Sequence, residues 1–138
     1  MQKLLILSFS ILFTTGLFAQ KSVYSGSDEK LEYNVNVEKY TDKVNDVFYE
    51  YYSLEIKNTS KSEVTFKPVF SYKTDKGESR TTLNRDETNT ITLKPSETIR
   101  GDVHNEKILT LFKQFTIGNS GKKASNDYYT IESVSIKY

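Results

Sequence analysis

The chain has 138 residues, 19 basic and 18 acidic side chains, a formal net charge of +1 and no cysteine. A balance so close to neutral argues against a nucleic-acid partner, which requires a net basic surface. The lack of cysteine excludes disulfides, thiol catalysis, thiolate metal sites and a lipid-modified cysteine anchor.

Residues 1–19 have the composition of a secretory signal peptide. Lys3 gives a short positive start, residues 4–13 are almost entirely apolar, and Ala19 offers a small side chain for cleavage. The apolar run is short for a bilayer and no basic stop-transfer cluster follows it, so a retained anchor is the less favoured alternative. We expect export to the periplasm or beyond the cell, with no stable membrane anchor after cleavage. A bacterial source is favoured, because small animal extracellular domains often carry disulfides. Residues 20–138 are expected to form one domain.

Residues 20–30 are expected to form a flexible lead-in or a short edge strand. Residues 31–38 then alternate cleanly between apolar and polar side chains, as in a strand of an antiparallel sheet with one solvated face.

Residues 47–72 hold two runs of alternating aromatic and β-branched side chains around the polar connection 58–62. This pattern predicts an antiparallel strand pair, in which every second side chain lies on the same face. One face of each strand is expected to supply the core, with Phe48, Tyr52, Leu54 and Ile56 from the first and Val64, Phe66, Phe70 and Tyr72 from the second.

Further short strands are expected along the rest of the chain, at residues 78–83, 88–93, 98–103, 108–117 and 128–138. Pro68 predicts a bulge or an edge position because proline cannot donate to the ladder. A second bulge is expected near residues 132–133, where the inward set changes phase. About seven to nine strands with frequent turns predict an all-β, antiparallel β-sandwich. Helix is expected to be nearly absent. Residues 102–111 are the one stretch that could form a helical turn.

Two stretches carry a resemblance to a known group of domains. Residues 54–60 (LEIKNTS) before an alternating strand, and residues 93–98 (LKPSET) before another strand, resemble small immunoglobulin-like domains exported by bacteria. In those domains a strand ending in Asn-x-Ser turns into its partner, and a Pro-Gly-Glu turn precedes a later strand; here Ser96 replaces the glycine. The resemblance implies an immunoglobulin-like antiparallel β-sandwich and no particular activity, because such sandwiches host unrelated functions.

His104 is the only histidine, so a site with two or three histidine ligands is excluded. A Ser-His-Asp triad is formally available, but the chain has no G-x-S-x-G elbow. The favoured interpretation is a solvent-exposed loop histidine. The alternative is a small exported hydrolase that uses His104 with a carboxylate.

Acidic residues occur in close pairs in expected turns, at Asp28-Glu29, Asp42/Asp46 and Asp86-Glu87. Their spacing matches no calcium loop, so turn solvation is favoured over a metal site. Paired catalytic carboxylates remain open on spacing alone, although short loops leave little room for a groove. We therefore expect no metal, no cofactor and no enzymatic activity.

Ten tyrosines all follow residue 19. If Phe48 and Tyr52 point inward, Tyr49 and Tyr51 point outward. Exposed tyrosines supply rigid amphipathic contact area for protein or carbohydrate partners. Tyr49 and Tyr51 are the candidate binding residues of an exported, non-enzymatic module that binds a protein or a glycan, or acts as an inhibitor or immunity protein. The alternative role is that these tyrosines stabilise the sheet by cross-strand pairing.

Two tripeptides match short functional motifs. Arg100-Gly101-Asp102 spells the integrin-binding sequence, but it lies in or beside an expected strand. Asn58-Thr59-Ser60 has the form of an N-glycosylation sequon. The favoured interpretation of the second is a turn in which Asn58 bonds its own backbone.

Overall fold

The computed structural model describes residues 22–85 and 90–138. The expected signal peptide and the Asp86-Glu87 pair lie outside the described residues. Within the described ranges the only helical element is one short 3-10 turn, and no helix there is long and apolar enough to cross a membrane.

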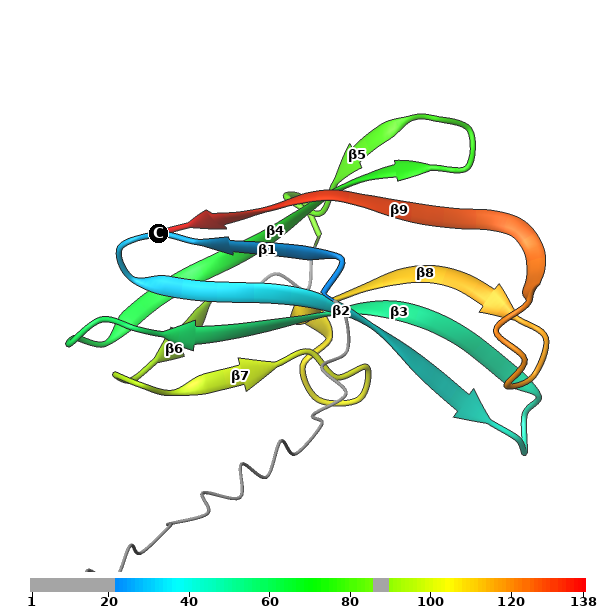
Figure 1. Cartoon of the computed structure of the whole chain (residues 1–138), viewed down its shortest axis with the longest axis horizontal. Helices are drawn as coiled ribbons and strands as arrows, with labels where there is room; N and C mark the ends of the chain where they lie inside the picture. The colour runs from blue at the N-terminus through cyan, green and yellow to red at the C-terminus, as the bar shows by residue number, and fades with distance from the viewer. Residues whose placement is uncertain (1–21, 86–89) are drawn as a thin grey trace, which may run out of the picture.

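β-Strands make up most of the described chain (Figure 1). In chain order the elements are β1 (Tyr24–Ser27), β2 (Leu31–Asp42), β3 (Val47–Asn58), β4 (Val64–Thr74), β5 (Ser79–Thr81), β6 (Ile91–Leu93), β7 (Thr98–Arg100), the 3-10 turn η1 (Lys107–Leu109), β8 (Thr110–Thr116) and β9 (Lys123–Lys137). The turn η1 lies where the sequence allows a helical turn, so the strand expected at 108–117 starts after it.

The strands form one nine-stranded antiparallel sheet in the order β1-β2-β3-β8-β9-β4-β5, with β6 paired to β4 and β7 paired to β3. The all-β class and the antiparallel pairing are therefore confirmed. Strand β3 pairs with β8 along residues 49–53 and with β7 along residues 55–57. The sheet is continuous and curls into a half-barrel (Figure 1). The strand pairing therefore does not confirm the expected sandwich of two opposed layers.

A polar contact joins the C-terminus, which follows β9, to the turn between β1 and β2. The Tyr138 hydroxyl donates a hydrogen bond to the Asp28 carboxylate, and the Lys30 ammonium lies 4.6 Å from the centre of the Tyr138 ring. Burial is the largest cause that raises the pKa of the Tyr138 hydroxyl, and the bond to Asp28 acts in the same direction. The C-terminal residue thus ties β9 to the turn between β1 and β2.

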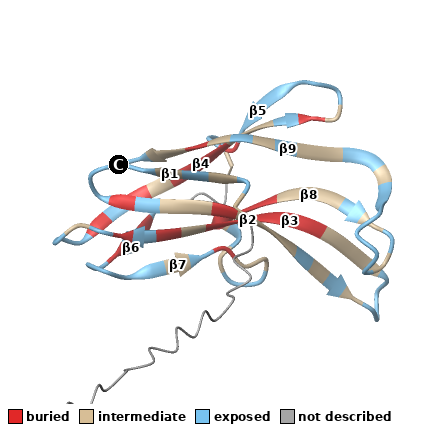
Figure 2. Cartoon of the chain, viewed as in Figure 1, coloured by how far each residue is buried: buried red, intermediate tan, exposed pale blue. Residues whose placement is uncertain are grey.

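The core lies inside the curl, where buried segments of β2, β3, β4, β6 and β8 meet (Figure 2). Its fully or almost fully buried members are Leu31, Val35, Tyr52, Leu54, Ile56, Val64, Phe66, Phe70, Ile91, Leu93, Leu109, Leu111 and Val134. Six of the eight expected core residues belong to this set. Tyr72 is half-buried against the cluster, and Phe48 lies outside it, beyond the point where the β2–β3 hairpin leaves the core.

The bulge expected near residues 132–133 is confirmed, and of the two alternatives expected for Pro68 the structure has the edge position. On β9 the register shifts so that Ser71 pairs with Ser133 and Tyr72 with Ile131, which leaves Glu132 as the extra residue. Pro68 instead pairs in regular register with Ile136. It occupies a stretch of β4 that has no second strand partner, because the β6 pairing ends before it and the β5 pairing starts after it. The edge alternative for Pro68 is therefore the correct one.

The two stretches that carry the family resemblance contact each other through Asn58, whose side chain is fully buried. Its amide nitrogen donates to the carbonyl oxygens of Ser62 (2.8 Å) and Leu93 (3.0 Å). Its amide oxygen accepts from the backbone and hydroxyl of Ser60, at 2.9 and 2.7 Å. The Asn58 backbone exchanges two further bonds with Ser96 and Glu97. The interpretation as a self-bonded turn is confirmed, and the amide that glycosylation would need is already engaged.

Ser96 has a φ of 66°, in the left-handed region that glycine adopts without steric cost. We expect Ser96→Gly to raise the free energy of unfolding by about 0.5 kcal/mol, since relief of backbone strain exceeds the extra chain entropy of glycine. Chemical denaturation measures this difference. Ser62→Gly is the matched control, because Ser62 lacks a positive φ and should lose stability. A Ser96→Gly protein less stable than the parent would show that the serine side chain supports the turn.

Candidate binding surface on the outer face of the sheet

The face of β2, β3 and β8 opposite the core carries a group of aromatic side chains. Side chains alternate along β3, so the inward placement of Tyr52 puts Tyr49 and Tyr51 on the other face. Across the ladder Tyr49 is paired with Tyr40 on β2 and with Phe115 on β8. We call Tyr40, Tyr49, Tyr51, Phe112 and Phe115 the aromatic face.

A bulge is what places two phenylalanines of β8 on this face. Residues three apart in a regular strand point to opposite faces. Here the pairing runs from Tyr49 with Phe115 to Tyr51 with Phe112, so the bulge absorbs one extra residue, Lys113. The Lys113 ammonium lies 3.3 Å from the carboxylate of Glu50, which is itself buried. The sequence analysis placed a strand at residues 108–117 but assigned neither phenylalanine to a face.

Tyr49 lies at the centre of the aromatic face. Its ring is stacked on Tyr40 at 4.7 Å between centroids, and it lies 6.2 Å from Tyr51, 6.0 Å from Phe112 and 6.3 Å from Phe115. Phe112 and Phe115 are 4.9 Å apart. These separations fall within the range of favourable aromatic pairs. Tyr49 therefore pairs across strands with Tyr40, as the alternative role expected, whereas the contact between Tyr49 and Tyr51 lies within β3.

The two candidate tyrosines differ in accessibility. Tyr51 is only 8% exposed, so the prediction that it is solvent-accessible is wrong. The segment after β7 lies near it, because Val103 and Lys107 line the same hollow as Tyr51 and the Asp102 carboxylate acts on its hydroxyl. Burial is the main cause that raises the pKa of the Tyr51 hydroxyl, and the nearby Asp102 carboxylate adds to it. Tyr49 is half-buried, and burial likewise raises the pKa of its hydroxyl.

The accessible part of the aromatic face lies on β8 instead. Phe115 is 45% exposed, and Ile117 beyond it is also exposed. On the other side of Tyr49 is a hollow of about 380 Å³ lined by Tyr49, Tyr51, Arg85, Val103, Lys107, Thr110 and Phe112. One guanidinium nitrogen of Arg85 donates to the carbonyl oxygen of Thr110 at 2.9 Å, which holds this cation against the wall.

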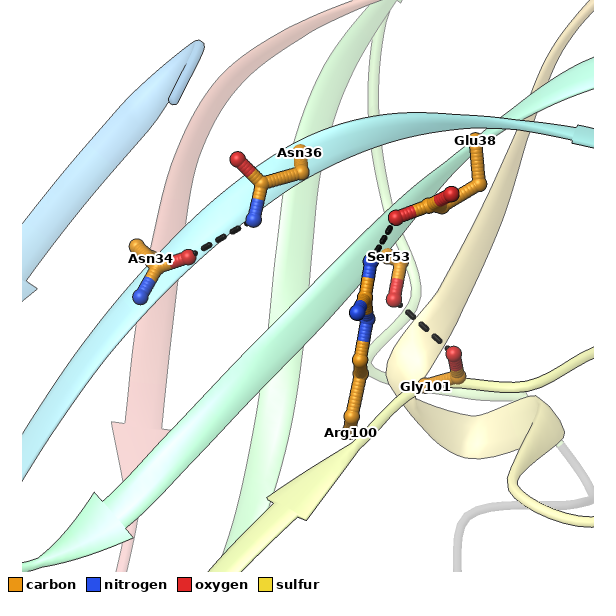
Figure 3. A network of polar contacts seen from close by, with 6 residues as sticks. All are labelled: Asn34, Asn36, Glu38, Ser53, Arg100 and Gly101. Carbon is orange, nitrogen blue, oxygen red and sulfur yellow. Dashed lines mark hydrogen bonds and ion pairs between the residues drawn. The ribbon is translucent and has the colours of Figure 1, made fainter. Parts of the chain in front are cut away.

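The loop that borders the hollow is fixed to β3 at Gly101. The Ser53 hydroxyl donates to the Gly101 carbonyl at 2.8 Å (Figure 3), and the Gly101 amide donates to the Leu54 carbonyl at 2.9 Å. The Asp102 carboxylate then accepts the backbone amides of His104 and Asn105. Those two bonds hold the pKa of Asp102 below its usual value.

A polar network continues the outer face along β2 (Figure 3). The Arg100 guanidinium forms an ion pair with the Glu38 carboxylate, and the Asn36 side-chain nitrogen donates to the Asn34 side-chain oxygen at 2.9 Å. With Arg100 paired, Gly101 buried and Asp102 bonded to its own loop, the Arg-Gly-Asp tripeptide does not form an exposed loop tip. This geometry does not match the display that integrin recognition needs.

His104 lies on an exposed part of the same loop. Its ring is 5.6 Å from that of Tyr40, and no hydrogen bond joins the ring to a carboxylate within residues 22–85 and 90–138. In the same ranges no group of three or more histidine, aspartate and glutamate side chains could hold a metal ion. The Asp102 carboxylate accepts the backbone amide of His104, and the imidazole acts on it electrostatically, in the direction that lowers the pKa of Asp102.

The fold and this surface define an all-β protein whose curled sheet carries its core on one face and a group of aromatic rings on the other. No family model matches the chain, and neither a curated protein nor a solved structure matches it.

Proposed function

We propose that this protein is an exported, non-enzymatic module that binds a protein or glycan partner through its aromatic face. The observation that carries the proposal is the position of Tyr49, which contacts four other rings on the face opposite the core. Rings that only stabilise a sheet do not need an accessible side. Here Phe115 is 45% exposed and Tyr49 lines an open hollow. Rigid aromatic side chains next to polar groups are the usual anchors of recognition surfaces.

Export and the relation to immunoglobulin-like domains belong to the same proposal. Export is supported by the charge and apolar pattern of residues 1–19. The immunoglobulin-like relation is supported by the contact between the turn at Asn58 and the turn that contains Ser96. A glycine-like φ at Ser96, where those domains have glycine, agrees with it.

The hydrolase alternative has less support. It requires the His104 imidazole to lie within hydrogen-bond reach of a carboxylate. Among the residues that the structure describes, the ring contacts Tyr40 instead.

Capture from envelope material tests the proposal. The purified exported protein is immobilised and exposed to envelope proteins and glycans of its source, with Tyr49→Ala and Phe115→Ala as variants. We expect each variant to retain at least about tenfold less partner, because loss of a central aromatic anchor costs about 2 kcal/mol. Phe115→Ala is the more informative variant, since its exposed ring contributes little to folding.

Tyr138→Ala is the matched control. Tyr138 is also an exposed aromatic residue, but it lies at the other end of β2, against Asp28. We expect this variant to retain the partner as the parent does. If the partner is lost from Tyr138→Ala and kept by Phe115→Ala, the binding surface is elsewhere and the proposal is wrong.

A further inference from the structure

The ends of two hairpins form one exposed tip of the molecule. The turn that joins β2 to β3 and the turn that joins β8 to β9 lie at the same end of the sheet, beyond its buried segments (Figures 1 and 2). The Thr41 hydroxyl donates to the side-chain oxygen of Asn119 at 2.9 Å, which holds the two turns side by side. We call residues 41–46 and 116–123 the paired tip.

Apolar side chains stand on the paired tip, where turns usually carry polar ones. Val44 is 94% exposed, more than any other large apolar residue in the described ranges, and Ile117 is 60% exposed. A hollow of about 360 Å³ connects the two hairpins, with Val47 and Phe48 from the first and Ile117 and Ala124 from the second. Exposed apolar area gathered at one end of a molecule indicates an interaction surface.

The backbone of the paired tip is bonded internally around both apolar side chains. The Asp42 carboxylate accepts the backbone amides of Val44 and Asn45, each at 3.1 Å. In the second turn the Ile117 amide donates to the Lys122 carbonyl at 2.9 Å. Because an unbonded amide is costly to remove from water, these bonds lower the cost of placing Val44 and Ile117 in an apolar medium.

Lysines flank the apolar residues in both turns. Lys43 precedes Val44, and Lys122 and Lys123 follow Ile117. All three lysines are exposed, and none of them forms an ion pair within residues 22–85 and 90–138. Long lysine side chains can place their ammonium groups at the level of lipid headgroups while their stems lie against apolar atoms.

Two carboxylates oppose these three lysines, so the paired tip has a net charge of +1. Asp42 is directed into its own turn, where it also accepts the side-chain nitrogen of Asn45 at 2.8 Å. Asp46 is exposed. The short aspartate side chains do not reach as far from the backbone as the lysines do, so the outermost charge of the tip is positive.

We infer that the paired tip binds reversibly to an anionic lipid bilayer, with Val44 and Ile117 in the headgroup region and the lysines at the lipid phosphates. Attachment of this kind depends on buried apolar area together with attraction to anionic lipid. A protein partner is less favoured, because a side chain that projects as far as Val44 is not part of a packed patch, whereas lipids rearrange around it. The inference goes beyond the proposed function and does not use the aromatic face.

Sedimentation with vesicles tests the inference. The purified exported protein is used without residues 1–19, since their apolar run would itself bind lipid. The probes are vesicles of phosphatidylcholine alone and of an equimolar mixture of phosphatidylcholine and phosphatidylglycerol. We expect the protein to sediment with the mixed vesicles, to bind the neutral ones more weakly, and to be released in part by added salt.

Val44→Ser/Ile117→Ser is the diagnostic variant, because both side chains are exposed and their loss leaves the core unchanged. We expect at least about tenfold weaker binding to the mixed vesicles, the scale set by the burial of one such side chain. Leu83→Ser is the matched control, since Leu83 is also exposed but lies beside Lys67, away from the tip. It should bind as the parent does, and equal losses in the two proteins would overturn the inference.

The charge contribution is tested by Lys122→Gln. We expect about fivefold weaker binding to the mixed vesicles and little change with the neutral ones, because one lysine near an anionic surface contributes about that factor. Lys61→Gln, an exposed lysine at the opposite end of β3, is its control and should bind as the parent does. Equal affinities of these two variants would contradict the role of the lysines.

A fluorescent label distinguishes insertion from adsorption. The chain has no cysteine, so Val44→Cys and Lys61→Cys each give one site for an environment-sensitive dye. We expect the emission to shift to the blue on vesicle binding at position 44 and to stay unchanged at position 61. Absence of sedimentation with both vesicles, or binding without a shift at position 44, would overturn the inference. If vesicles do not bind but envelope capture is lost from Val44→Ser/Ile117→Ser, the tip contacts a protein or glycan and the lipid assignment is wrong. Capture that depends on Phe115 alone leaves the proposed function in place whatever the vesicles show.

Discussion

Asn58→Ala is expected to lower the free energy of unfolding by about 4 kcal/mol, a large share of the roughly 5–15 kcal/mol that keeps a domain folded. The substitution removes two donated and two accepted hydrogen bonds. It also leaves the buried carbonyl of Leu93 without its side-chain donor. The lost amide nitrogen links Ser62, in the turn after β3, to Leu93 at the end of β6, so this link disappears, whereas the backbone bonds of residue 58 to Ser96 and Glu97 remain. Urea denaturation followed by circular dichroism measures the loss.

Two further variants define the cause. Asn58→Asp has nearly the same shape but cannot donate to Ser62 and Leu93, and it places a carboxylate in a fully buried position. We expect it to be at least as unstable as Asn58→Ala at neutral pH. Ser60→Ala removes only a partner of the amide oxygen and should cost about 1 kcal/mol. An Asn58→Ala protein within about 1 kcal/mol of the parent would show that the turns hold without this side chain.

Gly101→Ala is expected to cost about 3 kcal/mol, for a steric reason rather than a conformational one. An added Cβ at Gly101 would lie 2.3 Å from the carbonyl oxygen of Leu109 and 2.9 Å from its carbonyl carbon. Both atoms belong to the backbone, so the strain cannot be relieved by a rotamer change. The shift would also strain the bonds that fix Gly101 to Ser53 and Leu54.

Gly26→Ala is the matched control for this experiment. At Gly26 the added atom would meet the far end of the Tyr33 ring, 2.6 Å away, and a side chain can move aside. Gly26 also lies in the edge strand β1. We expect Gly26→Ala to cost clearly less than Gly101→Ala by thermal denaturation. Equal costs at the two sites would mean that the loop after β7 yields as easily as an edge strand.

Gly101→Ala should also weaken binding at the proposed site. The loop fixed at Gly101 carries Val103 and Lys107 to the wall of the hollow. A shift of this loop moves both away from Tyr51. The folded fraction of the Gly101→Ala protein should therefore bind less partner, even after the loss of stability is taken into account.

Local pattern accounts for what could be predicted from the sequence. The inward faces of β3 and β4 follow from period-two burial, and Leu54, Phe66 and Phe70 do share one interior. The bulge at Glu132 follows from a change of phase within one strand. The turn at Asn58 follows from the tendency of asparagine to bond its own backbone. Each of these properties is decided by residues close together in the chain.

Contacts between distant segments account for what could not be predicted. Alternation assigns Tyr51 to the outer face, but its burial and its position beside a loop more than fifty residues later do not follow from a period-two pattern. Phe112 and Phe115 reach the same face through a bulge that forms against β3. The spacing of the two phenylalanines around Lys113 and Gln114 was the available signal. Periodicity likewise predicts which face of a strand is buried but not the order of the strands in the sheet. A continuous curled sheet and a sandwich of two opposed layers are therefore compatible with the same period-two pattern of apolar residues.

The central claim is that the aromatic face is the recognition surface of this protein. Nuclear magnetic resonance of the ¹⁵N-labelled protein, mixed with envelope extract of its source, tests it most directly. The account predicts that backbone amide signals of residues 49–51 and 107–115 shift or broaden, while those of β1 and β5 stay unchanged. Changes confined to β1 and β5, or spectra in which residues 49–51 and 107–115 stay unperturbed, would contradict it.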